Sequence, residues 1–284
     1  MPDPHPGYSY HLGTSRRFGP LRTTLRMASD LGYMSVEGTP DMLSDAASIA
    51  RLEVGLGAAG LSMPTCHITQ TQLRAAPRRT AAMARRLGVH TVFVGASTGD
   101  KAPRDADDWF LLGSRMRRYA EALRAAGLTV GWHNQTDELA PVEAGASGLS
   151  ILFDTDRDLA WQIDVGAMAL AEQPLTEWMA RHGERITAAH LRDLAKPGDN
   201  LREDGWADLG KGTVDLHGLL SSLRSRGVNM MVMAHANPSD DERFAARAIA
   251  TVRRMDQMLV PALDTDPTLY PKPARKQACM WMTP

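Results

Sequence analysis

Short apolar runs alternate with longer amphipathic stretches along this chain, with a period of about thirty residues. Several of the amphipathic stretches close on a glycine immediately before the next apolar run, as helices do. These glycines are Gly32, Gly60, Gly88, Gly127 and Gly227. The apolar runs have the length and composition of buried strands and cover residues 8–13, 33–37, 61–67, 90–95, 128–133, 160–164, 186–191 and 228–235. This alternation predicts an α/β protein built as a single (β/α)8 TIM barrel.

One unit of the alternation is less regular than the others. The segment SGLSILFDTD, residues 147–156, fits a helix and an additional strand equally well. A doubly wound open sheet is the structural alternative to the barrel. Such sheets usually carry a glycine-rich phosphate loop after an early strand, and neither GxGxxG nor GxxxxGK occurs in this sequence. We therefore expect the barrel.

The end of the chain differs in composition from the rest. We expect the barrel to span residues 1–258. Residues 259–284 are rich in proline and finish with the apolar cluster CMWM. This Pro-rich segment is expected to be either a disordered tail or an arm that packs on the barrel or on a neighbouring subunit.

Composition narrows the range of partners. A length of 284 residues with 43% hydrophobic content allows a large core, and a formal net charge of −1 gives no reason to expect nucleic acid or an anionic membrane as a partner. The arginine-rich stretch 74–86 fits the solvated face of an outer helix. No secretory signal, membrane-spanning run or disulfide framework is recognisable. We expect a cytoplasmic protein with a small-molecule substrate, and the sequence leaves homo-oligomer formation open.

Three of the predicted strands end in a side chain that can bind a metal ion. These are His133, Asp164 and His190. The carboxyl ends of all strands in such a barrel meet at one face, so these three side chains are expected to converge there. Two imidazoles and one carboxylate suit a single divalent ion, and Mn, Fe, Co and Zn are all candidates.

The motifs around these residues resemble the sugar phosphate isomerase/epimerase family of xylose isomerase-like TIM barrels, which includes inosose dehydratases. The matching pieces, in chain order, are GYMSVE, GLSMPTCH, GLTVGWHNQ, WQIDVGA, GERITAAHLRD and LGKGTVDLHGLL. The resemblance implies one divalent metal ion, with His133, Asp164 and His190 at the ligand positions of strands five, six and seven. Strand eight departs from the family, because Ala234 stands where a glutamate ligand is usual and His235 follows it.

Three further residues are candidates for acid-base catalysis: Glu37, His67 and His235. Glu37 ends the second predicted strand and is expected to act as a base or to hydrogen-bond a polyol, unless it is a solvated loop residue. His67 ends the third strand and resembles the family's active-site histidine, with a hydrogen-bonded loop histidine as the alternative. His235 could replace the missing ligand only through a local bulge, because successive residues of a strand face opposite sides.

Five neighbouring residues are candidates for substrate binding: Trp132, Asn134, Gln135, Arg192 and Asp193. Trp132 is expected either to stack on a sugar face or to pack in the core. Asp193 is expected either to orient a metal ligand or to cap a loop. Histidines outside the predicted strand ends, such as His90 and His217, are expected to have structural or solvated roles.

The residues and the resemblance together predict a metal-dependent isomerase, epimerase or dehydratase (lyase) of carbohydrate metabolism. It would act on a small polyhydroxylated or keto substrate by proton transfer next to a carbonyl. Ala234 keeps two alternatives open. The first is a metal-independent acid-base enzyme of the same fold that uses Glu37, His67, His133 and His235 in a specialised biosynthetic pathway. The second is a non-catalytic barrel that serves as a binding or partner subunit.

Overall fold

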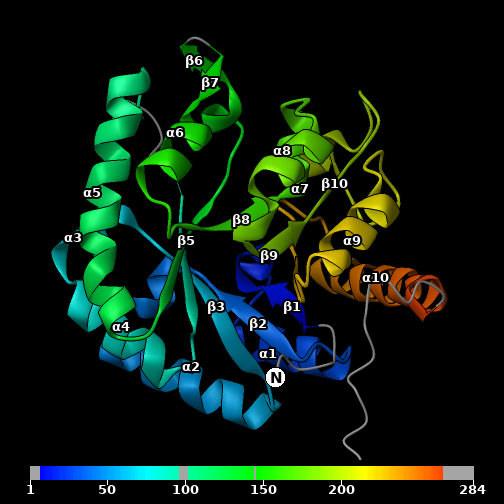
Figure 1. Cartoon of the computed structure of the whole chain (residues 1–284). Helices are drawn as coiled ribbons and strands as arrows, with labels where there is room; N and C mark the ends of the chain where they lie inside the picture. The colour runs from blue at the N-terminus through cyan, green and yellow to red at the C-terminus, as the bar shows by residue number, and fades with distance from the viewer. Residues whose placement is uncertain (1–6, 96–101, 144, 265–284) are drawn as a thin grey trace, which may run out of the picture.

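Eight parallel strands close into a barrel in the computed structural model, which describes residues 7–95, 102–143 and 145–264 (Figure 1). Around the barrel the order is β1, β12, β9, β8, β5, β4, β3 and β2. The strands are β1 (Gly7–His11), β2 (Ser35–Gly38), β3 (Ser62–Ile68), β4 (Thr91–Val94), β5 (Thr129–His133), β8 (Ala160–Asp164), β9 (Ile186–Leu191) and β12 (Met230–Met233). The predicted fold is confirmed, and each strand coincides with an expected apolar run.

Helices connect the strands and cover the outside of the barrel (Figure 1). They are α1 (Leu21–Asp30), α2 (Ala46–Ala59), α3 (Gln70–Ala75), α4 (Pro77–Arg86), α5 (Ala106–Ala125), α6 (Gly148–Thr155), α7 (Val165–Leu170), α8 (Leu175–His182), α9 (Leu216–Ser225) and α10 (Asp241–Asp264). The five predicted closing glycines all have positive φ. At Gly60, φ of 66° turns the chain out of α2, and the amide of Leu61 then reaches back to the carbonyl of Leu56 at 3.1 Å.

The irregular segment after β5 forms a helix and not a ninth barrel strand. Helix α6 begins after Ser147, whose hydroxyl accepts a hydrogen bond from the amide of Ser150 at 3.2 Å. A two-stranded ribbon of β6 (Pro141–Glu143) and β7 (Ala146–Ser147) precedes it. A second ribbon, β10 (Asp193–Leu194) with β11 (Trp206–Ala207), follows β9. Both ribbons belong to loops that leave the carboxyl ends of barrel strands, where the predicted site residues lie.

Alternation along the strands places apolar side chains against the outer helices and polar side chains inside the barrel. In β8, the ring of Trp161 lies 5.6 Å from that of Phe153 in α6 and 6.0 Å from that of Trp178 in α8. Gln162 and Asp164 point to the opposite side, into the barrel, because side chains alternate along a strand. Asp164 stands beside His190 in the β8–β9 register. The fold therefore turns the polar residues of the strands inward.

Helix α10 closes the barrel at its seam. The hydroxyl of Tyr8 in β1 donates to Asp256 at 2.8 Å, and that of Tyr33 donates to the carbonyl of Ala245 at 2.8 Å. The helix runs to Asp264, past the predicted boundary at Met258, and the expected tail from residue 265 lies outside the described residues, as does the CMWM cluster. The division into barrel and tail stays a prediction. Among the described residues, no helix is long and apolar enough to cross a membrane.

Candidate functional site

A cavity of about 640 Å³ opens at the carboxyl ends of the barrel strands. Strands β1, β3, β5, β8 and β9 each contribute the last or nearly the last side chain of the strand to its wall. These side chains are His11, His67, His133, Asp164 and His190. Their rings and carboxylate come from five strands and meet at one place, as the carboxyl ends of a parallel barrel do.

His133, Asp164 and His190 converge on one side of this cavity. Each offers one ligand atom, and the three atoms lie within 4.8 Å of one another. The Oδ2 atom of Asp164 is 3.7 Å from Nε2 of His133 and 3.9 Å from Nδ1 of His190. We call these residues the cavity set. Nδ1 of His133 is buried and has no hydrogen-bond partner among the described residues. Nε2 of His133 lies beyond hydrogen-bond distance of Asp164, and two imidazoles with one carboxylate fit a divalent metal ion.

Asp164 is held in place from both sides. Its Oδ1 accepts a hydrogen bond from the amide of Ala167 at 2.8 Å and so caps helix α7. Its own amide donates to the side-chain oxygen of Asn134 at 3.0 Å, which also accepts from Trp161 Nε1 at 2.9 Å. Asn134 is fully buried and acts as the support of Asp164, which corrects the expectation that it binds substrate.

Arg192 borders the cavity and pairs with the free oxygen of Asp164. Its Nη1 donates to Oδ2 at 3.1 Å, and its guanidinium lies 3.6 Å from the ring centroid of Trp206. Stacking on the indole stabilises the guanidinium through a cation–π contact, and the guanidinium keeps its positive charge. Arg192 and Gln135 are the two predicted substrate-binding residues whose side chains remain next to the cavity.

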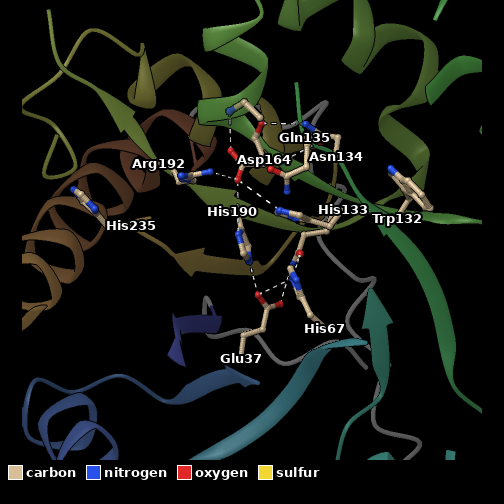
Figure 2. A network of polar contacts seen from close by, with 12 residues as sticks. Glu37, His67, Trp132, His133, Asn134, Gln135, Asp164, His190, Arg192 and His235 are labelled. Atoms are coloured by element: carbon tan, nitrogen blue, oxygen red, sulfur yellow. Dashed lines mark hydrogen bonds and ion pairs between the residues drawn. The ribbon is translucent and has the colours of Figure 1, made fainter. Parts of the chain in front are cut away.

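Glu37 lies beneath the cavity and is fully buried. Its Oε1 accepts hydrogen bonds from Nε2 of His190 and, at 3.2 Å, from Nε2 of His67, while Oε2 accepts from Gln162 at 2.6 Å (Figure 2). Burial alone would raise the pKa of Glu37, but the two histidines outweigh it and hold this pKa well below its usual value. Glu37 does not border the cavity. It is therefore placed to orient the histidines, and its expected role as a base or as a hydrogen-bond partner of a polyol stays a prediction.

His67 reaches the cavity from β3 and is linked to the same network. Its Nε2 lies 2.7 Å from Oε1 of Gln162 as well as near Glu37. Burial lowers the pKa of His67, but the charge of Glu37 and the hydrogen bonds with Glu37 and Gln162 together outweigh burial, and the net effect raises this pKa. His67 is thus a cavity-facing group whose protonated form is stabilised.

Sequence analysis missed His11 and Gln162. The ring of His11 lies 5.0 Å from that of His190 and 5.4 Å from that of His67. Burial, followed by the neighbouring His190, lowers the pKa of His11 well below its usual value. The signal was present, because His11 ends the first strand just as His133 ends the fifth. Gln162 lies two residues before the end of β8, where the same alternation that directs Asp164 inward also directs Gln162 inward.

Two predicted substrate contacts are not at the cavity. Trp132 precedes His133 and faces the other side of β5 (Figure 2). There its Nε1 donates to Glu138 at 2.9 Å, and its ring meets that of Trp109. The expected sugar stacking is therefore wrong, and Trp132 packs in the core. The carboxylate of Asp193 accepts from the amides of Leu194, Gly210, Gly212 and Val214 at 2.9–3.0 Å. Of the two roles expected for Asp193, the structure shows the loop cap.

Ala234 and His235 follow β12, and both line the cavity. The ring of His235 packs against Phe244, with centroids 5.1 Å apart, and lies near Glu203, whose Oε2 is 3.5 Å from Nε2. Burial lowers the pKa of His235 to about 4. His235 belongs to neither group of ligand-competent side chains among the described residues, so the bulge that would make it a ligand is not formed.

Comparison with known proteins agrees with this fold. Residues 25–255 match the family of xylose isomerase-like TIM barrels. A search of curated proteins finds no match.

Several solved structures share the fold. A sugar phosphate isomerase/epimerase from Parabacteroides distasonis has a TM-score of 0.68 at 15% identity, covering 87% of this chain and 94% of its own. AsbF from Bacillus anthracis, described as a probable 3-DHS dehydratase, has a TM-score of 0.68 at 13% identity, covering 87% and 98%. IolI, solved with a zinc atom, has a TM-score of 0.68 at 14% identity, covering 89% and 98%. The family match spans most of the described barrel, and the chain belongs to the xylose isomerase-like TIM barrel family.

Proposed function

We propose that this protein is a metal-dependent isomerase, epimerase or dehydratase that acts on a small polyhydroxylated or keto substrate. The observation that carries the proposal is the cavity set, in which His133, Asp164 and His190 present ligand atoms within 4.8 Å at the wall of a 640 Å³ cavity. The 3.7 Å between Nε2 of His133 and Oδ2 of Asp164 supports it, because this distance is too long for a hydrogen bond and leaves that ring nitrogen available to an ion.

His133, Asp164 and His190 would hold a divalent ion that would supply Lewis-acid polarisation of a carbonyl or hydroxyl oxygen of the substrate. The side chains of the chain supply the rest of the chemistry. His67 faces the cavity and is kept protonated more readily by Glu37, so we propose that its ring donates a proton to the substrate. Glu37 and Gln162 fix the orientation of that ring. Arg192 and Gln135 stand where they can bind oxygen atoms of the substrate.

One observation favours a metal-independent acid-base enzyme as the second candidate. Arg192 already donates to Oδ2 of Asp164 at 3.1 Å, so the carboxylate has a cationic partner without an ion. In that case His67, with its raised pKa, and His11, with its lowered pKa, would be the acid and base that face the cavity. Metal content separates the two candidates.

The first test measures metal and proton exchange together. Protein loaded with Mn, Fe, Co or Zn at equimolar metal and then desalted is expected to retain about one ion per chain. His133→Ala is expected to lose it, while His217→Ala, an exposed position on α9, keeps it. In deuterated buffer, a panel of ketoses and inososes is screened by NMR for exchange of the C–H next to the carbonyl.

The position of His67 predicts a different pattern for His67→Gln. This variant should keep the ion, because His67 is outside the cavity set, and should lose proton exchange. Wild-type protein that binds no ion would refute the metal-dependent proposal and favour the acid-base candidate. Full exchange in His67→Gln would refute the role of His67.

A further inference from the structure

The floor of the cavity holds a second group of side chains that can bind metal. Ligand atoms of His11, Glu37, His67 and His190 all lie within 4.8 Å of one another. They come from β1, β2, β3 and β9, whereas the cavity set comes from β5, β8 and β9. We propose that these four residues, the floor set, form a second metal site that takes a zinc-like ion when that ion is in excess.

His190 belongs to both sets through different atoms. Its Nδ1 lies 3.9 Å from Oδ2 of Asp164, and its Nε2 is hydrogen-bonded to Oε1 of Glu37 (Figure 2). A neutral imidazole has one lone pair and one N–H. With an ion on the Nδ1 side, Nε2 carries the proton and donates it to Glu37, an arrangement common around metal-bound histidines. An ion in the floor set replaces that proton, which passes to the buffer.

The donor types of the floor set select the ion. Three imidazoles and one carboxylate match the nitrogen and oxygen ligands and the coordination number of four that zinc prefers. Oxygen-preferring ions such as Mg²⁺ and Ca²⁺ are poorly suited to three nitrogens. The rings of His67 and His190 are nearly parallel, 5.3 Å apart with an angle of 19° between their planes, and His11 stands beside both. All four side chains are thus close together before any ion binds.

The order of filling follows from the hydrogen bonds that each site must give up. In the cavity set, Nε2 of His133 lies 3.7 Å from Asp164, beyond hydrogen-bond distance, and the bond from Arg192 to Oδ2 of Asp164 is the one that an ion must share or displace. In the floor set, Glu37 already accepts from His67, His190 and Gln162, and an ion must displace at least the first two of these bonds. The second ion is therefore expected to bind more weakly than the first and to appear only above one equivalent of metal.

A filled floor set has a consequence for activity, which rests on the proposed function. His67 bound to an ion through one ring nitrogen cannot take up a second proton to become an imidazolium, so it cannot act as the proposed acid and the second ion inhibits proton transfer. The floor set would then make the enzyme sensitive to excess zinc. Mn²⁺ prefers oxygen ligands and should inhibit much less.

Metal stoichiometry tests the floor set without any substrate. Wild-type protein is dialysed against increasing free Zn²⁺, and bound metal is measured by elemental analysis. We expect a first plateau at about one ion per chain and a second at about two. His11→Ala should keep the first and lose the second, because His11 is the one floor residue that belongs to no other described hydrogen-bond network. His133→Ala should lose the first, and His217→Ala should show both plateaus.

The outcomes distinguish the two proposals. A single plateau in wild-type protein that His133→Ala removes and His11→Ala leaves intact would overturn the floor site and leave the proposed function standing. Two plateaus that both survive in His11→Ala would also overturn it, since the second ion would then lie elsewhere. Absence of any bound ion would overturn both proposals. His11→Gln, which keeps a polar side chain of similar size, repeats the test if His11→Ala is poorly folded.

Discussion

Removing the carboxylate of Asp193 should destabilise the protein strongly, although the residue does not touch the cavity. Its Oδ2 accepts from the amides of Gly210 and Gly212, both at 2.9 Å, and its Oδ1 accepts from those of Val214 and Leu194, both at 3.0 Å. The residue is 1% exposed. Asp193→Ala would leave four amides without their acceptor.

The size of the effect follows from these four bonds. A hydrogen bond to a charged group contributes about 1.5–3 kcal/mol, but such contributions do not add fully. Gly210 is exposed and Gly212 is half-buried, so water can replace part of what is lost. We expect Asp193→Ala to lower the free energy of unfolding by about 3–5 kcal/mol, close to the cost of breaking a buried charge pair. The melting temperature should fall by roughly 6–20 °C.

Thermal and urea unfolding followed by circular dichroism measure this change. Asp193→Asn keeps the size of the side chain and one acceptor oxygen, so its loss should be about half as large. Asp199→Ala removes an exposed aspartate from the same loop and should change stability by less than about 0.5 kcal/mol. If Asp193→Ala were no more destabilising than Asp199→Ala, the loop would not depend on this carboxylate and the reasoning would fail.

Two further predictions concern stability. The pKa of His235 falls from about 6.5 in the unfolded chain to about 4 in the fold, so the unfolded state binds more protons between these values. The contribution of neutral His235 to the free energy of unfolding is complete above pH 6.5 and falls, by about 3 kcal/mol at most, as the pH falls towards 4. In urea unfolding from pH 4 to 7, the free energy of unfolding of His235→Gln should therefore depend less steeply on pH. In α6, Gly148→Ala puts a methyl group 2.2 Å from the Trp109 ring and should cost about 1–3 kcal/mol in thermal unfolding. Gly57→Ala in α2 meets nothing within 4 Å and should instead stabilise by roughly 0.5–1 kcal/mol; equal effects of the two substitutions would contradict the packing argument.

The strand ends were predictable because two independent regularities agree. Apolar runs mark the strands, and the carboxyl ends of parallel strands share one face, so His133, Asp164 and His190 could be placed together from sequence. The same logic applies to His11 once the first strand is known to end there, but the predicted strand, residues 8–13, runs two residues further. Alternation within a strand also separates Trp132 from His133, and a strict period of two would have assigned Trp132 to the core.

Loop geometry could not be predicted in the same way. The pair Arg192–Asp193 follows β9, and only the path of the loop decides that Arg192 turns to the cavity while Asp193 binds backbone amides. The hydrogen bonds of Glu37 depend on residues from β3, β8 and β9, between 30 and 153 positions away. No local pattern reports such distant partners.

The seam between β1 and β12 decides when during synthesis the floor set can form. Tyr8 and Asp256 are 248 residues apart and bond across this seam, and Tyr10 pairs with Met233 beside it. While the ribosome is still making the second half of the chain, β1 has an unpaired edge and its histidine has no His190 to meet. Loop closure over such distances is slow. The floor set, which takes His11 from β1, would therefore be complete only in a late step, whereas the cavity set lies on the neighbouring strands β5, β8 and β9 and does not depend on this seam.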